Sequence, residues 1–294
     1  MNTQQKEKIL KAGKIASQIK KYIKPIIKEG TPLLEIAEKI EDKITELGGK
    51  PAFPTNLSIN EIAAHYTPLY NDTSEAHGLL KIDFGVHING WIADTAFSVD
   101  LENNEENKKL IKASEKALNN AVQKSKNGIS AGEIGKMIQE SIESEGFSPI
   151  INLTGHEMEE YELHAGLTIP NIDNKTTEKL KKGLYAIEPF ATAGSGKVYE
   201  GKLSGIYILV DEKNIRSPES RKILNFIIEE YKTLPFCSRW IVKQFGARAL
   251  FSLRQLEDNG NLYQYPQLIE VSHSKVSQAE NTILIDDEVI VTTE

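Results

Sequence analysis

An internal repeat constrains the fold of this 294-residue chain more than any other feature. Residues 30–48 and 128–146 align at a constant offset of 98 positions, and matched glycine, glutamate and isoleucine residues recur along both copies. Both copies carry apolar residues at i, i+4 and i+8, which is the period of an amphipathic helix. Two copies are too few for a solenoid, so the repeat favours two halves of similar plan that form a pseudo-twofold pair. Two unrelated helical hairpins are the alternative.

The two copies also have similar neighbours. An amphipathic helix is predicted before each copy, at 5–28 and 106–126, and a strand is predicted after each, at 51–59 and 147–153. The predicted N-caps and C-terminal stops of the repeated helices are Thr31, Ser130, Gly48 and Gly146. The chain therefore predicts an α+β fold with two similar halves.

A β-hairpin with two aspartates is the strongest local signal. Asn89-Gly90 between two apolar runs predicts a type I′ turn that sets Ile88 opposite Trp91. In that register Asp83 and Asp94 share one face of the hairpin, with Cβ atoms on the order of 7 Å apart. Two carboxylates between apolar strands repel each other unless a cation lies between them, so the pair favours a divalent metal site. A solvated sheet face is the alternative.

Three histidines and two glutamates lie in sequence contexts that make them candidate functional-site residues. His65 and His156 follow short uncharged segments, and the repeat offset maps His65 to the position next to His164. Glu188 ends an alternating strand pattern, and Glu280 leads into another. The other three histidines, His77, His87 and His273, lie in polar or turn-like contexts and are expected at the surface.

Composition excludes several other classes. No apolar run approaches the ~18 residues of a membrane span, and the N-terminus lacks the apolar core of a secretory signal. The single cysteine, Cys237, excludes a disulfide framework and is expected to be a packed side chain, which points to a cytoplasmic location. The net charge of −7 argues against general nucleic-acid binding, and all five arginines lie between Arg216 and Arg254, which suggests an inserted segment.

Taken together, these segments resemble the methionine aminopeptidases of type II, in their short form without an N-terminal extension. The segments that carry the resemblance are PAFPTNLSINEIAAHYTP at 51–68, KIDFGVHINGWIADTAFSV at 81–99, NLTGHEMEEYELHAG at 152–166, AIEPFATAG at 186–194 and SQAENTILI at 277–285. They follow the family order along nearly the whole chain.

The resemblance implies a pita-bread fold, an α+β arrangement with a pseudo-twofold axis. The spacing of 92 residues between Glu188 and Glu280 is that of the type II class. It implies a catalytic domain of residues 1–196 plus 267–294 and a helical, winged-helix-like insertion at 197–266. The insertion is expected to dock a partner or to form a wall of the site rather than to bind nucleic acid.

The resemblance also implies a dinuclear metal centre. Asp83 matches a ligand of one ion, Asp94 and Glu280 match bridging ligands, and His156 and Glu188 match ligands of the other ion. Such a ligand set suits Co, Mn, Fe(II) or Zn. The matching substrate-binding positions are His65, His164, Phe53 and Tyr265.

The implied activity is metal-dependent removal of N-terminal methionine. A metal-activated water or hydroxide is expected to attack the carbonyl after the first residue, while Glu188 moves the proton, His164 binds the carbonyl oxygen and His65 contacts the scissile nitrogen. Expected partners of this monomer are methionine peptides and nascent chains, with the ribosome as one place where such chains are met. The alternatives are an enzyme like prolidase or aminopeptidase P, and a non-enzymatic binding protein with the same fold.

Overall fold

The structure is a computed structural model that describes all 294 residues. Its helices are α1 (Thr3–Ile23), α2 (Leu33–Glu46), α3 (Glu105–Lys124), α4 (Ala131–Glu143), α5 (Pro218–Glu230), α6 (Ser238–Phe245) and α7 (Ala249–Asp258). Its strands are β1 (Lys50–Ile59), β2 (Ile62–Ala64), β3 (Leu79–Ile88), β4 (Trp91–Asp100), β5 (Ser148–Pro149), β6 (Thr154–Met158), β7 (Thr168–Pro170), β8 (Gly183–Ile187), β9 (Phe190–Thr192), β10 (Val198–Leu209), β11 (Phe236–Cys237), β12 (Leu262–Glu270), β13 (Val276–Gln278), β14 (Asn281–Ile285) and β15 (Val289–Val291). None of the helices combines the length and apolar character that a membrane crossing requires.

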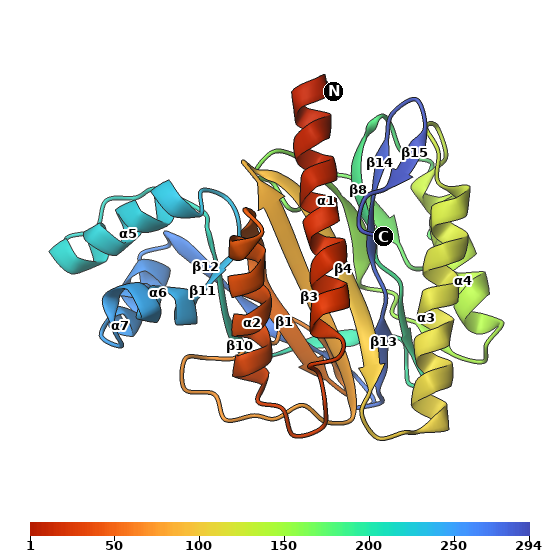
Figure 1. Ribbon diagram of the computed structural model, residues 1–294, viewed down its shortest axis with the longest axis horizontal. Coiled ribbons are helices and arrows are strands. Elements are labelled where there is room, and N and C mark those ends of the chain that lie inside the picture. Colours follow the sequence, from red (N-terminus) through yellow and green to blue (C-terminus); the bar gives the residue numbers. More distant parts are fainter.

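In the first half, α1 and α2 pack on the antiparallel sheet β1–β3–β4 (Figure 1). The apolar stripes of both helices and the inner face of the sheet form one buried cluster. Asn89 and Gly90 have φ angles of 49° and 88°, as a type I′ turn requires, and Ile88 pairs with Trp91. The predicted hairpin is therefore confirmed with its register, and Gly85 lies opposite Asp94.

The second half repeats this plan. Helices α3 and α4 share a buried cluster with residues of the five-stranded sheet β15–β14–β8–β6–β7. Helix α4 begins 98 residues after α2, so the offset of the sequence repeat is also the offset of the two helices. The predicted α+β fold with two similar halves is thereby confirmed. Of the two expected N-caps only Ser130 is one, because α2 is capped by Pro32 rather than Thr31.

The prediction of a strand at 147–153 is largely wrong. Only Ser148 and Pro149 are extended, and the chain turns at Ile151 and Asn152. The side-chain amide of Asn152 accepts from the N–H of Val198 at 2.9 Å and donates to its carbonyl at 2.8 Å. The side chain of Asn152 thus makes the two hydrogen bonds to Val198 that the backbone of a neighbouring strand would otherwise make. This contact between distant segments leaves no periodic signal in the sequence.

The segment between β9 and β13 contains α5, α6 and α7 and also two long strands. Strands β10 and β12 pair antiparallel from Val198–Glu270 to Leu209–Leu262. The three helices pack on the far end of this pair around a buried cluster of their own. In Figure 1 they project from the side of the molecule that carries α2.

The two halves join where β4 passes beside the segment that leads into β14. Ala96 and Glu280 form an isolated antiparallel bridge, with the Glu280 N–H donating to Ala96 O at 3.0 Å. Thr282 accepts from the Asp94 N–H at 2.7 Å and donates to Asp94 O at 2.8 Å. These contacts fix the backbone of Asp94 and Glu280 against each other.

Candidate metal centre

Four carboxylates and one histidine converge at this junction. The five residues are Asp83 in β3, Asp94 in β4, His156 in β6, Glu188 directly after β8 and Glu280 directly before β14. Their ligand atoms form two groups, Asp94 with His156 and Glu280, and Asp83 with Glu188 and Glu280. Within each group all ligand atoms lie within 4.8 Å of one another. The sequence-based expectation assigned Glu188 to the same ion as His156, whereas this grouping sets Glu188 beside Asp83.

The electrostatics of this cluster call for a cation. Asp94 and Glu280 are 3% and 1% exposed, and burial together with mutual repulsion raises their pKa values well above the ordinary range. Burial also raises the pKa of Asp83 to about 7, and burial with the charge of Asp83 raises that of Glu188. Four carboxylates, two fully buried and two partly buried, with no Lys or Arg beside them carry a large desolvation cost unless they are neutralised.

Several ligand atoms have no hydrogen-bond partner within the protein. They are Oδ1 of Asp83, Oδ1 of Asp94, both carboxylate oxygens of Glu280 and Nδ1 of His156. Native proteins rarely bury polar atoms in this state. Oxygen donors with one imidazole, buried and otherwise unsatisfied, fit a site for divalent first-row metal ions.

Gln278 is a member of this site that sequence reasoning missed. Its Nε2 donates to Glu188 Oε1 at 2.7 Å and lies 3.3 Å from Asp83 Oδ2. It therefore ties the carboxylates of two halves together and lowers their pKa values against the larger effect of burial. Its position two residues before Glu280, on the same side of an extended chain, is the signal that could have found it.

The cluster lies at a cavity of about 370 Å³. Asp83, Asp94, His156 and Glu188 contribute to its lining, as do the four expected substrate-binding residues Phe53, His65, His164 and Tyr265. The structure thus brings eight of the nine predicted site residues to one cavity, and Glu280 lies directly behind them in contact with the same groups. Apolar residues such as Leu163, Phe190 and Ile206 complete the wall.

The two expected non-ligand histidines have different surroundings. His65 Nδ1 lies 3.1 Å from Pro266 O, and burial lowers the pKa of His65 to about 4. Because a carbonyl oxygen only accepts, Nδ1 carries the proton of the neutral ring and Nε2 is left as an acceptor. The φ angle of 64° at His65 is strained for a non-glycine residue, as is common at functional sites. His164 is exposed and its ring packs edge-on against His156 at 4.5 Å between centroids.

One histidine expected at the surface is buried. His87 is 6% exposed, accepts from the Gly90 N–H at Nδ1 and packs against Tyr161. The covering residue comes from a distant loop, so the local polar context of His87 was misleading. Cys237 is 1% exposed and free of a partner thiol, as expected of a packed side chain.

The fold and this site define a class of protein. The family model for metallopeptidase family M24 matches residues 7–287, and the chain belongs to that family of hydrolases. Membership implies divalent metal ions, which agrees with the unsatisfied donors described above.

Particular relatives narrow the class. The chain is 48% identical over 284 residues to a methionine aminopeptidase of Methanocaldococcus jannaschii, covering 96% of this chain and 95% of the relative. It is 47% identical over 297 residues to one of Pyrococcus abyssi, covering 98% and 99%. The resemblance to methionine aminopeptidases predicted from the sequence is therefore confirmed.

Solved structures support the pita-bread fold. The methionine aminopeptidase of Thermotoga maritima matches with a TM-score of 0.73 at 23% identity, over 100% of this chain and 98% of that one. A thermophilic Arx1 matches with a TM-score of 0.81 at 16% identity, over 99% and 91%. The prolidase of Pyrococcus furiosus matches at 0.62 and 19%, over 100% and 64%. At these identities the likeness concerns the fold.

Proposed function

We propose that this protein removes the N-terminal methionine from peptides and newly made proteins by metal-dependent hydrolysis. The observation that carries the proposal is the cluster of four carboxylates and His156, three of whose members are fully buried, at a cavity of about 370 Å³. Relatives over nearly the full chain are methionine aminopeptidases, which supports methionine as the residue removed.

In this proposal Asp83, Asp94, His156, Glu188 and Glu280 would together hold two divalent ions. The two overlapping groups of ligand atoms support this number. Four ionised carboxylates balance the charge of two such ions, which limits the cost of burial. When bound, Co, Mn, Fe(II) or Zn would lower the pKa of a water and polarise the scissile carbonyl.

The protein's own groups carry the remaining chemistry. Glu188 takes the proton of the attacking water at a carboxylate oxygen and passes it to the leaving nitrogen as the C–N bond breaks, and Gln278 holds the other oxygen in place. His65 accepts the scissile amide N–H at Nε2, because its Nδ1 proton is directed to Pro266. His164 donates to the carbonyl oxygen as charge develops on it.

The apolar part of the cavity receives the methionine side chain. Phe53 is 6% exposed on β1, and Tyr265 on β12 lies with its ring 5.4 Å from that of His65. Both residues line the cavity from opposite segments of the chain. This arrangement supports a pocket for one flexible apolar side chain beside the reacting bond.

The wider organisation follows the same proposal. Residues 197–266 form an insertion on a catalytic domain of residues 1–196 and 267–294, which its separate hydrophobic cluster supports. The enzyme acts as a monomer in the cytoplasm and meets nascent chains there, including those at the ribosome. Its insertion provides one wall of the substrate cavity, since Ile206, Pro235 and Tyr265 belong to it.

A cleavage assay tests the function. The protein is stripped of metal with a chelator and assayed with and without Mn or Co on a Met-Ala peptide, its N-acetylated twin and an Ala-Pro peptide. Release of methionine from the first peptide alone, and only with metal, is expected. Failure to cleave that peptide with metal bound would contradict the proposal. Cleavage of the Ala-Pro peptide would instead favour a prolidase, which the relatives do not favour.

A further inference from the structure

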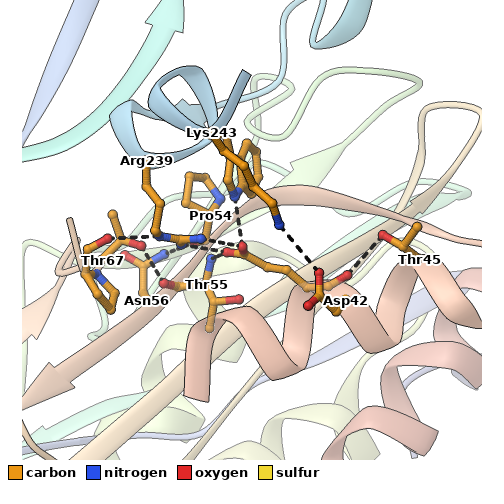
Figure 2. A network of polar contacts seen from close by, with 11 residues as sticks. Asp42, Thr45, Pro54, Thr55, Asn56, Thr67, Arg239 and Lys243 are labelled. Carbon is orange, nitrogen blue, oxygen red and sulfur yellow. Dashed lines mark hydrogen bonds and ion pairs between the residues drawn. The ribbon is translucent and has the colours of Figure 1, made fainter. Parts of the chain in front are cut away.

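A buried ion pair connects helix α2 to helix α6 of the segment between β9 and β13. Arg239 donates from Nη1 to Glu41 Oε2 at 2.6 Å and from Nη2 to Glu41 Oε1 at 2.9 Å. The residues are 4% and 7% exposed. Figure 2 shows Arg239 and the neighbouring Lys243 reaching from α6 toward α2. A bidentate pair of this kind fixes direction as well as distance.

Both charged groups have further hydrogen bonds that reach the polypeptide around the substrate cavity. Glu41 also accepts from Trp240 Nε1 at 2.8 Å and from the N–H of Thr55 at 3.3 Å. Arg239 Nε donates to the carbonyl of Pro68 at 3.0 Å. A buried ion pair is tolerated when such contacts satisfy its remaining polar atoms.

The contact with Thr55 falls on an irregularity of β1. Phe53 lies opposite Gly85 and Asn56 lies opposite Asp83, so β1 has one residue more than β3 in this interval. A bulge of this kind redirects the side chains around it. Phe53, Pro54 and Asn56 line the cavity, while the Thr55 N–H faces Glu41.

The contact with Pro68 falls on the segment that follows His65. Thr67 Oγ1 donates to Thr55 O at 2.8 Å, so this segment and the bulge are held to each other as well as to the ion pair. On the other side, α6 directly follows β11, which pairs with β10 at Ile206, a residue of the opposite cavity wall. The ion pair is thus a buried polar link between the two walls, in addition to the contact of His65 Nδ1 with Pro266 O.

We propose that Glu41 and Arg239 are positioning residues that set the spacing of the two walls of the methionine pocket, and so its selectivity for side-chain length. Phe53 and Pro54 form one wall, and Ile206, Pro235 and Tyr265 form the other. The inference rests on the proposed function in one respect, namely that the cavity binds the substrate side chain. Neither residue contacts the substrate or the metal ligands in this account.

The test uses R239K, which keeps the charge but lacks the planar fork. A matched control is D42N, because Asp42 and Lys243 join the same two helices at 3.9 Å with side chains that are 75% and 74% exposed. If R239K does not fold, the E41Q/R239M double variant removes both charges together and avoids an uncompensated buried charge.

The first readout is kinetic, on peptides beginning with methionine or with ethionine, which is one methylene longer. With R239K we expect KM for the methionine peptide to rise and the preference for methionine over ethionine to fall by roughly tenfold, the size of one-methylene discrimination in an apolar pocket. We expect kcat to stay within about twofold, since the reacting groups keep their contacts. D42N should behave like the wild type.

The second readout is amide hydrogen exchange of the metal-free protein, which does not depend on activity. R239K should accelerate exchange in peptides covering 52–58 and 65–69 while leaving α4 unchanged, as local opening does. Equal acceleration in α4 would mean a general loss of stability and would overturn the proposal, as would unchanged KM and selectivity with an active enzyme. If the wild type releases no methionine, the proposed function is wrong. Hydrogen exchange still shows in that case whether the Glu41–Arg239 pair holds segments 52–58 and 65–69 in place.

Discussion

At the residue scale, the protonation state of His65 determines which hydrogen bond its ring can make to the substrate. Nδ1 is directed to the Pro266 carbonyl and the pKa is lowered to about 4, so the ring is neutral with Nε2 as an acceptor at neutral pH. His65→Ala should therefore lower kcat by ~10²–10³-fold, the size of effect seen when one positioned hydrogen-bonding group is lost. The measurement is a rate assay with metal content determined on the same sample. His77→Ala, at an exposed histidine, is the control, and full kcat in the His65 variant would refute the role.

Glu280 has a different kind of importance because it belongs to both ligand groups. Glu280→Gln should abolish binding of both ions, whereas His156→Ala should weaken the site of one. Metal analysis after dialysis against Mn distinguishes these cases by stoichiometry. Two ions retained by the Glu280 variant would show that this carboxylate is not shared.

The site residues that belong to a local sequence pattern could be predicted from the sequence. Asp83 and Asp94 follow from a hairpin whose turn residues specify the register. The buried state of His87 could not be predicted in this way, because it depends on Tyr161, and the contact of Gln278 with Glu188 joins residues ninety positions apart. Such packing between distant segments has no periodic trace in one sequence.

At the element scale, the repeat predicts both α2 and α4, but their starts differ. Ser130 caps α4 with a capping box, while α2 is preceded by Pro32 without a side-chain cap. Ser130→Ala should therefore lower the free energy of unfolding by about 1 kcal/mol. Thr31→Ala, at the N-cap that the sequence predicts for α2 but that makes no cap hydrogen bond there, should have a clearly smaller effect. Denaturant unfolding of both variants measures this, and equal losses would contradict the difference in capping.

The strand at 147–153 shows the limit of periodicity at this scale. Among its apolar residues Ile150 is fully buried, in a cluster with Ala63 and Phe190, whereas Ile151 is exposed. The backbone turns once Asn152 pairs with Val198. An apolar run predicts burial, but the partner that decides between strand and turn comes from elsewhere in the chain.

At the scale of the whole molecule, the site exists only because the two halves meet. Asp83 and Asp94 come from the first half, while His156, Glu188 and Glu280 come from the second half. Each half has its own buried apolar cluster, and the four carboxylates of the site lie between the two halves. The junction is therefore the part of the fold whose stability depends most on metal and on pH.

The pH dependence follows from the direction of the pKa shifts. Folding raises the pKa of Asp83 to about 7 and those of Asp94, Glu188 and Glu280 further above their ordinary values. The folded metal-free protein thus binds more protons than the unfolded chain, so its stability falls as pH rises toward the folded pKa values. Below pH 6.5 the lowered pKa values of His65 and His156 act in the opposite direction, and above pH 8 so does Lys20, whose pKa burial lowers to about 8, which leaves pH 6.5–8 as the informative window.

Thermal unfolding in chelator should accordingly show a loss of stability from pH 6.5 to 8, with a slope of up to ~1.4 kcal/mol per pH unit for each carboxyl that titrates. Glu280→Gln removes one of the four charges, so its slope should be shallower and its stability at pH 8 in chelator higher than that of the wild type. Added Mn should stabilise the wild type more at pH 8 than at pH 6.5, because protons and metal compete for the same oxygens. The prediction is wrong if the metal-free stability of the wild type does not change with pH across this window and the variant shows the same pH dependence. The four carboxylates would then not be the groups that destabilise the metal-free protein.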